Sequence, residues 1–216
     1  MSRNIVKIEN LSFKYAKNLV LDGVSFDINK GDFIVLTGPN GGGKSTLARL
    51  IFGEIELQKG KISKNASISF APQKLIPAKN MPITVGKFLE YIEEKYPFYE
   101  ELYNAFNIKS IANLQLADLS GGQLQKVNLV ANIRKNYDLI ILDEPDQNLD
   151  FDSQEIFYKF FKSIHKNSSF IVISHDIHSF AAFEDVKFYC INQKIHCGTS
   201  FSTVHHSHYD CKGCNS

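Results

Sequence analysis

The sequence predicts an α/β fold in which helices cover both faces of a mostly parallel sheet. Three short apolar runs, at residues 33–36, 139–142 and 170–173, are typical of buried strands. Helical patterns follow the first two runs, at residues 45–52 and 154–164. Strands that alternate with helices favour a parallel sheet, because each helix crosses a face of the sheet between two strands.

Two segments near the ends of the chain also have strand patterns. Residues 5–8 alternate apolar and polar side chains, and we expect them to form an edge strand. Residues 187–191 and 194–197 flank Asn192 and Gln193, a pattern that predicts a hairpin.

The composition changes after residue 75. Residues 76–118 are rich in Tyr, Phe, Asn and Lys and contain no strongly apolar strand. Helices are predicted at residues 85–96 and 100–106, because Pro82 precedes the first and Pro97 separates the two. This segment therefore indicates a helical insert within the α/β domain.

These elements predict one domain followed by a short tail. The domain covers residues 1–200, with a core of residues 1–75 and 119–200 and a helical subdomain of residues 76–118. Residues 201–216 form a tail rich in His and Cys.

Composition excludes some classes of protein. The 216 residues contain 24 Lys and Arg and 23 Asp and Glu, so the net charge of +1 gives no general argument for a nucleic-acid partner. The chain has no apolar run approaching the roughly 18 residues of a membrane span, and its N-terminus lacks the apolar core of a signal peptide. We expect a cytoplasmic protein.

A phosphate-binding loop is the clearest motif. Residues 38–46, GPNGGGKST, fit the pattern G-x-x-x-x-G-K-[ST] between a predicted strand and a predicted helix. Glycines let backbone N–H groups surround phosphate oxygens, and the helix N-terminus adds its dipole. Lys44 is predicted to reach the β- and γ-phosphates, and the Ser45 hydroxyl is predicted to bind Mg²⁺.

An acidic pair follows the second apolar strand. Asp143 and Glu144 come directly after residues 139–142, at the carboxyl end where parallel sheets bind ligands. Asp143 is predicted to bind Mg²⁺, directly or through water. Glu144 is predicted to act as the general base that polarises an attacking water.

Residues 119–123, LSGGQ, narrow the class of nucleotide-binding protein further. In this position, between the helical insert and the acidic pair, the string resembles the signature of ATP-binding cassette (ABC) ATPases. The resemblance extends over residues 4–200. It implies a P-loop NTPase core with an N-terminal antiparallel β part and an inserted helical subdomain. It also implies ATP and Mg²⁺ as ligands, and a homodimer in which each signature closes on the γ-phosphate bound by the partner.

The resemblance assigns a role to further residues. Tyr15 matches the aromatic that stacks on adenine, and Gln73 matches the glutamine that senses Mg²⁺ and water. Asp150 matches an aspartate of the loop that crosses the dimer interface, and His175 matches the histidine that contacts the γ-phosphate.

These arguments give three sets of predicted site residues. The catalytic residues are Glu144, His175 and Gln73. The Mg²⁺ ligands are Ser45, Gln73 and Asp143. The nucleotide-binding residues are Tyr15, Gly38, Pro39, Asn40, Gly41, Gly42, Gly43, Lys44, Ser45, Thr46, Ser120, Gly121, Gly122, Gln123 and Asp150.

Four positions depart from the family pattern. Asp146 and Asn148 stand where Thr and Gly are frequent, and Lys126 and Ala131 stand where Arg is frequent. The departures leave the predicted phosphate and Mg²⁺ groups intact, but they put in doubt the tuning of the dimer interface and of the hydrolysis rate.

Two stretches are similar to one branch of the family. Residues 71–85 resemble the glutamine-loop region of zinc and manganese importer ATPases, and residues 189–198 resemble their late hairpin. The resemblance implies the ATPase of a divalent-metal importer, with zinc preferred. Its implied partners are a membrane permease, with the ATPase peripheral on the inner face of the cell membrane, and a solute-binding protein. No nucleic-acid partner is expected.

Other functions stay open at this point. One is a soluble ABC-type ATPase that acts in translation or DNA repair, although the chain has one cassette and no heptad run. Another is an ABC transporter ATPase for a different substrate. A cassette that does not hydrolyse ATP is disfavoured, because Lys44, Ser120, Glu144 and His175 are all present.

The C-terminal tail is a candidate zinc site. His206, His208, Cys211 and Cys214 offer nitrogen and sulfur ligands of the kind that Zn²⁺ prefers. The alternative is a disordered chain end. If the tail binds zinc, we expect it to slow the neighbouring ATPase when zinc is plentiful.

Overall fold

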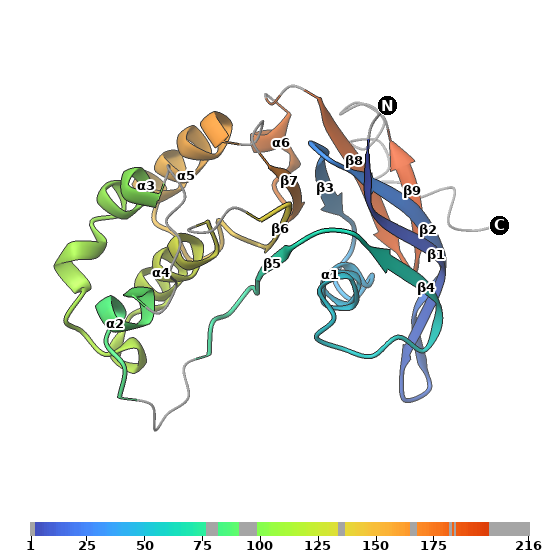
Figure 1. Ribbon diagram of the computed structural model, residues 1–216, viewed down its shortest axis with the longest axis horizontal. Helices are drawn as coiled ribbons and strands as arrows, with labels where there is room; N and C mark the ends of the chain where they lie inside the picture. Colours follow the sequence, from blue (N-terminus) through green and yellow to red (C-terminus); the bar gives the residue numbers. More distant parts are fainter. Residues whose placement is uncertain are drawn as a thin grey trace.

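A six-stranded sheet forms the centre of the fold (Figure 1). The computed structural model describes residues 3–76, 82–90, 99–133, 137–164, 168–181, 183 and 185–198. The strand order is β5-β6-β7-β3-β8-β9, parallel throughout except for the antiparallel pair β8–β9. The strands are β3 (Phe33–Thr37), β5 (Ile68–Ala71), β6 (Leu139–Asp143), β7 (Ser169–Ile173), β8 (Val186–Asn192) and β9 (Lys194–Gly198).

The three predicted apolar strands are confirmed as β3, β6 and β7. Every residue of these three strands is buried, as expected for parallel strands covered on both faces. Alternate side chains enter two different cores: Phe33 and Val35 pack on one face of the sheet, whereas Ile34 and Leu36 pack on the other.

A smaller antiparallel sheet lies beside the first. It has the order β2-β1-β4, with β1 (Asn4–Tyr15), β2 (Asn18–Asn29) and β4 (Lys59–Lys64). The prediction that residues 5–8 form an edge strand is wrong, because β1 pairs with β2 on one side and with β4 on the other. Alternation of apolar and polar residues reports one buried face, and it says nothing about the neighbours in the sheet plane.

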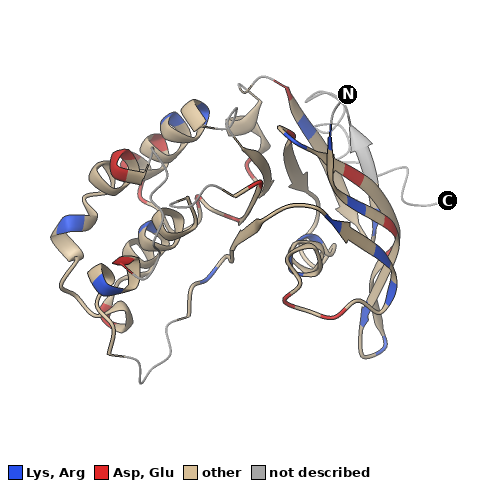
Figure 2. Cartoon of the chain, viewed as in Figure 1, with Lys and Arg blue, Asp and Glu red and all other residues tan. Residues whose placement is uncertain are grey.

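Charged side chains occupy the solvent face of this antiparallel sheet. Lys, Arg, Asp and Glu are interspersed along its strands, as Figure 2 shows. Lys7 and Glu9 of β1 form an exposed ion pair of 2.9 Å. Such a pair on the surface contributes little to stability.

Helices cover the two faces of the large sheet unequally (Figure 1). Helix α1 (Lys44–Phe52) packs between the large sheet and the antiparallel sheet. The other face carries α4 (Gly121–Ile133), α5 (Phe151–Ile164) and α6 (Ile177–Phe180). Beyond them lie α2 (Val85–Glu90), α3 (Tyr99–Ala105) and the 3₁₀ turns η1 (Ile108–Ile111) and η2 (Leu116–Asp118).

The predicted helices are found with small differences. Helix α1 matches residues 45–52, α3 matches 100–106, and α5 begins three residues before the predicted 154. Helix α2 covers the first part of the predicted helix at 85–96, whereas residues 91–96 lie outside the described residues. The predicted hairpin is confirmed as β8–β9, with Gln193 in a left-handed conformation at φ 60°.

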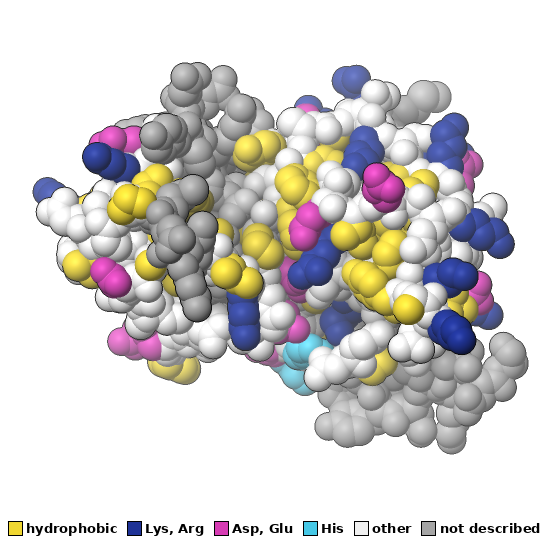
Figure 3. Space-filling view, turned by 90° about the horizontal axis from the view of Figure 1, so that it is seen from below, with side chains coloured by type: hydrophobic (Ala, Val, Ile, Leu, Met, Phe, Trp, Pro, Cys, Tyr) yellow, Lys and Arg dark blue, Asp and Glu magenta, His cyan; other side chains and the backbone are white. Residues whose placement is uncertain are grey.

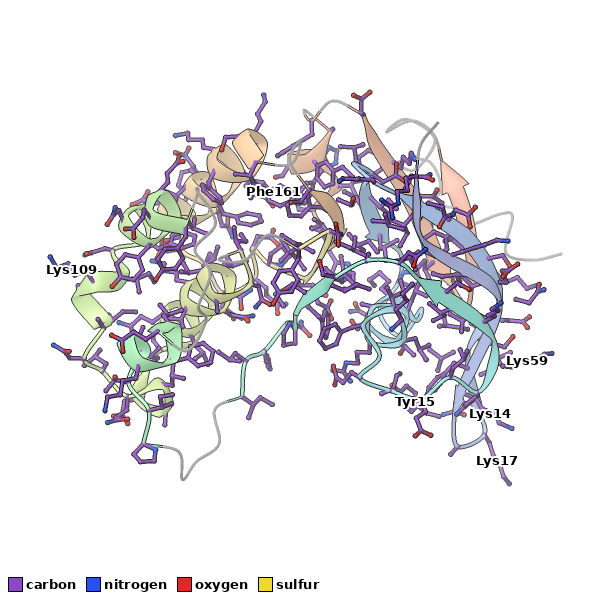
Figure 4. All side chains as sticks on the ribbon, viewed as in Figure 1. Lys14, Tyr15, Lys17, Lys59, Lys109 and Phe161 are labelled. Atoms are coloured by element: carbon purple, nitrogen blue, oxygen red, sulfur yellow. The ribbon has the colours of Figure 1, made fainter. Side chains whose placement is uncertain are left out.

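An aromatic cluster joins α5 to the sheet. Phe161, labelled in Figure 4, lies on α5. The centroid of its ring is 4.7 Å from that of Phe170 in β7, 5.3 Å from that of Phe33 in β3 and 5.4 Å from that of Phe157 one turn earlier. Phe161 is fully buried. Its edge-to-face contacts with Phe170 and Phe33 add to the free energy gained by burial of the rings.

We expect Phe161→Ala to lower the free energy of unfolding by about 3–5 kcal/mol, because it leaves a cavity between α5 and the sheet. Phe151, on the same helix, is 73% exposed, so Phe151→Ala should change stability by less than about 0.5 kcal/mol. Urea unfolding of the two variants measures both values. Equal losses would contradict this description of the core.

Hydrogen bonds join the residues that immediately precede β5 and β6. The Asp138 carboxylate accepts hydrogen bonds of 2.8 Å from both the backbone N–H and the hydroxyl of Ser67. The Ser67 backbone bond, followed by the hydroxyl bond, holds the pKa of Asp138 below its ordinary value. A carboxyl with a lowered pKa stabilises the folded state above its unfolded pKa, and it loses that effect as the pH falls through the folded pKa.

We expect Asp138→Asn to destabilise the protein at pH 7 by up to about 1 kcal/mol, a small value because the pair is exposed. The difference from wild type should shrink as the pH falls below the ordinary Asp pKa of about 4. Urea unfolding at a series of pH values measures it. A difference that stays constant down to acid pH would rule out the charged form of Asp138 as its source.

Candidate active site

A cavity of about 540 Å³ opens at the carboxyl ends of the central strands. The loops after β3, β5, β6 and β7 all contribute to its wall, together with side chains from β1, β2 and α1. Its lining residues are Tyr15, Val20, Asn40, Gly41, Gly42, Gly43, Lys44, Ser45, Thr46, Gln73, Glu144, Gln147 and His175. The structure therefore brings most of the predicted nucleotide-binding and catalytic residues to one place.

The predicted phosphate loop is held against strand β8. Gly38 has φ 133°, and a Cβ atom there would collide with the carbonyl oxygen of Ile191. A Cβ atom at Gly42 would lie 2.5 Å from the same oxygen. The Gly42 carbonyl in turn accepts a hydrogen bond of 3.0 Å from the Gln193 N–H. Glycine is required at both positions because backbone passes too close for a side chain.

Lys44 folds back over this loop. Its Nζ donates hydrogen bonds to the carbonyl oxygens of Gly38 at 2.9 Å and Pro39 at 3.0 Å. Burial lowers the pKa of Lys44, and the nearby Glu144 and Asp143 carboxylates act in the opposite direction. Lys44 also begins α1, so the unpaired N–H groups of that helix face the same cavity.

Asp143 has the surroundings that a cation needs. Its side chain is buried at the end of β6, and Oδ1 has no hydrogen-bond partner among the residues that the structure describes. Burial raises the pKa of Asp143, whereas a hydrogen bond from Ser45 lowers it. A buried carboxylate oxygen beside a hydroxyl offers the hard ligands that Mg²⁺ prefers, so the predicted pair fits this ion.

Glu144 is held from two sides. Its Oε1 lies 3.2 Å from Nε2 of His175, and its Oε2 accepts a hydrogen bond of 2.6 Å from Nε2 of Gln73. Its backbone is left-handed at φ 49°, and its N–H donates to the Ile173 carbonyl at 2.9 Å. The three predicted catalytic side chains thus form one connected group.

Two glutamines of this region were not predicted. Gln147 Oε1 accepts a hydrogen bond of 2.7 Å from Gln73 Nε2. Gln125 of α4 is buried, and its Nε2 donates to the carbonyl oxygens of Pro145 at 3.0 Å and Glu144 at 3.4 Å. No spacing rule identifies either residue, although Gln147 follows the acidic pair closely in the sequence.

The signature residues lie elsewhere, at the start of α4. Ser120 and Gln123 form a reciprocal capping box: the Ser120 N–H donates to Gln123 Oε1 at 3.0 Å, and the Gln123 N–H donates to Ser120 Oγ at 3.3 Å. Gly121 and Gly122 lie between them as the first residues of α4. The lining of the cavity includes none of these four described residues.

Asp150 is also outside the cavity, where it caps α5. Its Oδ1 accepts a hydrogen bond of 2.9 Å from the Ser153 N–H, and Oδ2 lies 3.2 Å from Lys126 Nζ. The Ser153 hydroxyl, followed by the Ser153 N–H and Lys126, lowers the pKa of Asp150 to about 2. Lys126 stands where Arg is frequent, and it still supplies a cation that pairs with the Asp150 carboxylate.

The structure also gives a role to the departure at Asp146. The Tyr158 hydroxyl donates a hydrogen bond of 2.8 Å to Asp146 Oδ2. Burial, together with the Asp146 carboxylate, raises the pKa of Tyr158. Asp146 thus anchors the loop after Glu144 to α5. Asn148 has a left-handed backbone at φ 65°, a conformation that Asn adopts more readily than most residues other than Gly, so Asn is accommodated where Gly is frequent. Nothing in the structure explains Ala131.

The predicted zinc ligands of the tail cannot be placed. His206, His208, Cys211 and Cys214 lie outside the described residues, which end at 198. Among the residues that are described, there is no group of three or more His, Cys, Asp or Glu side chains that could hold a metal ion. The tail site stays a prediction.

Comparison with known proteins confirms the resemblance to ABC ATPases. The ABC transporter family profile matches residues 21–147. Zinc import ATP-binding protein ZnuC of Wigglesworthia glossinidia brevipalpis is 40% identical over 200 residues, covering 90% of this chain and 85% of the relative. Zinc import ATP-binding protein ZnuC of Ehrlichia chaffeensis is 36% identical over 207 residues, covering 93% and 85%.

Solved structures have the same fold. A metal-chelate type ABC transporter in an inward-facing conformation matches with a TM-score of 0.73 and 27% identity, covering 91% of this chain and 84% of the other. The ATP-binding subunit of an ABC transporter matches with a TM-score of 0.80 and 22% identity, covering 94% and 92%. These findings confirm the predicted P-loop NTPase fold. The profile covers more than half of the chain, and the relatives match about nine-tenths of it, so the chain belongs to the ABC transporter family as one of its ATPases.

Proposed function

We propose that this chain is the ATP-hydrolysing subunit of an importer that takes up a divalent metal, with zinc as the preferred cargo. The observation that carries the proposal is the cavity where the phosphate loop, Asp143, Glu144 and His175 meet. The choice of zinc is supported by the relatives named zinc import ATP-binding protein, which match most of the chain.

The phosphate loop and Lys44 bind the triphosphate in this proposal. Lys44 Nζ already faces the loop, so its donors transfer from the Gly38 and Pro39 carbonyls to phosphate oxygens when ATP enters. Tyr15 lines the same cavity and is 47% exposed at the end of β1, which leaves its ring accessible to adenine (Figure 4). Ser45, Asp143 and Gln73 would hold Mg²⁺, which neutralises charge on the transferring phosphoryl group.

Glu144 accepts the proton of the attacking water. A carboxylate is a suitable general base when it is within hydrogen-bond reach of the water and is held in one orientation. His175 and Gln73 hold the two oxygens of Glu144, one each. His175 is also placed to contact the γ-phosphate, because its side chain lines the cavity.

A second copy of the chain completes the site. Residues 120–123 lie at the N-terminus of α4, away from the cavity of their own chain, and a helix N-terminus attracts anions. We propose that two copies associate so that each presents this end of α4 to the ATP of the other. The exposed Asp150 would lie at the interface.

The helical subdomain, residues 76–118, is the proposed docking site for a membrane permease. Among the described residues, no helix has the length and apolar character that a membrane crossing requires. Hydrophobic side chains reach the surface in the view from below (Figure 3). Within residues 76–118, the side chains of Ile76 and Leu114 are 84% and 44% exposed. In this proposal the chain is peripheral on the inner face of the cell membrane. A solute-binding protein is the remaining component of the importer.

We expect Glu144→Gln to lower the ATPase rate by about 10²- to 10⁴-fold while ATP binding is retained, because the amide cannot accept the proton. Phosphate release measures the rate, and calorimetric titration measures binding. Lys44→Ala is the matched control for the phosphate contacts and should weaken ATP binding itself. Full turnover by the Glu144 variant would refute the proposed mechanism.

We expect deletion of the gene to lower zinc uptake and to impair growth at low zinc. Accumulation of radioactive zinc in the deletion strain measures the effect, and complementation by the wild-type gene but not by the Glu144→Gln variant is the control. A defect in manganese or iron uptake with normal zinc uptake would exclude zinc as the cargo. The ATPase assignment would survive that result.

A further inference from the structure

The side-chain amide of Gln73 makes two hydrogen bonds through one nitrogen. Nε2 donates to Glu144 Oε2 at 2.6 Å and to Gln147 Oε1 at 2.7 Å. An amide NH₂ group has two hydrogens, so these two acceptors use both of them. A flipped Gln73 amide would place its oxygen against a Glu144 carboxylate oxygen, which has no hydrogen to donate, so this contact fixes the orientation of the Gln73 amide. The Gln147 amide then presents its oxygen to Gln73. The Gln73 carbonyl oxygen is the atom left for another ligand.

Gln147 is attached to a well-supported turn. Its backbone N–H donates to the Glu144 carbonyl at 3.2 Å. The preceding residue, Asp146, is held through its carboxylate by the Tyr158 hydroxyl at 2.8 Å and through its carbonyl by Gln154 Nε2 at 3.2 Å. Gln147 also lines a second cavity, of about 290 Å³, beside the main one. It thus stands between the site and the loop that leads to Asp150.

Glu144 alone cannot keep the Gln73 amide in place during the proposed reaction. Its carboxylate accepts a proton from water, and a protonated or water-bound oxygen is a poorer acceptor for Gln73. Gln147 is a neutral acceptor that takes no part in this proton transfer. Its hydrogen bond with Gln73 therefore persists when the bond between Gln73 and Glu144 weakens.

We propose that Gln147 is a positioning residue that holds the Gln73 amide with its carbonyl oxygen toward the Mg²⁺ of bound ATP. The inference rests on the proposed function, because it assigns to Gln147 a task within that same site. Gln147 acts through Gln73 alone, so the effects of changing Gln147 and Gln73 on metal affinity should not add.

The test measures metal binding rather than turnover. Mn²⁺, as a spectroscopic substitute for Mg²⁺, is titrated by electron paramagnetic resonance into the full chain saturated with a non-hydrolysable ATP analogue. Gln147→Met removes the acceptor at nearly constant shape and at an exposed position. We expect it to weaken Mn²⁺ binding by about tenfold, the lower end of the effect of losing a partner of a metal ligand. Affinity for the analogue without metal should stay within about twofold of wild type.

Two further variants separate positioning from general damage to the loop. In a Gln73→Met background, Gln147→Met should have no further effect on Mn²⁺ affinity. Gln154→Met removes hydrogen bonds to the Asp146 and Leu149 carbonyls of the same loop without touching Gln73, so it should weaken Mn²⁺ binding much less than Gln147→Met does.

Three results would overturn the role of Gln147. They are unchanged Mn²⁺ affinity in Gln147→Met, an equal loss in Gln154→Met, and a loss that persists in the Gln73→Met background. If the wild-type chain bound no ATP analogue, the proposed function would fall, and this inference would fall with it. Normal analogue binding with any of the three results would remove only the role of Gln147.

Discussion

Burial of both faces of β3, β6 and β7 is the constraint on which the site depends. Alternate side chains of these strands enter two separate cores, so a register shift of one residue would move every side chain into the wrong core. The strands are parallel, so their carboxyl ends lie at one edge of the sheet. The phosphate loop, the acidic pair and His175 lie at those ends or within two residues of them. Hydrophobic packing thus determines the position of polar groups that contribute nothing to it.

The order of strands in the sheet also explains which polar groups meet. Gln73 follows β5, Glu144 follows β6 and His175 follows β7, and these three strands are neighbours in the sheet. The carboxylate therefore lies between the amide and the imidazole because its strand lies between theirs. The left-handed backbone at Glu144 turns the chain at this point, and its N–H is satisfied by the adjacent strand β7. A strained residue is tolerated where its surroundings hold it on several sides.

Much of this arrangement could be predicted from the sequence, and the rest has physical reasons for being missed. Strands buried on both faces are uniformly apolar and stand out, whereas β4, with the sequence KGKISK, shows mostly solvent-facing residues and was not predicted. The residues of the phosphate loop have a fixed spacing, because one short segment of the chain supplies all of the phosphate-binding groups of the loop. Gln147 has no such spacing, since its role depends on Gln73, which is distant in sequence. The separation of residues 120–123 from the cavity of their own chain was implied only by the resemblance to ABC ATPases, because tertiary packing determines it and no local pattern reports it.

The hydrogen bonds of Lys44 have a consequence for how ATP finds its site. The ammonium group donates hydrogen bonds to two carbonyl oxygens of the loop, so a cation already holds these parts of the loop together. The entropy needed to order the loop is lost when the chain folds, and a ligand that arrives later does not incur that cost again. ATP binding then amounts to an exchange of acceptors around one fixed positive charge. Phosphate oxygens thus replace carbonyl oxygens as the acceptors of Lys44, and the loop does not have to form a new structure.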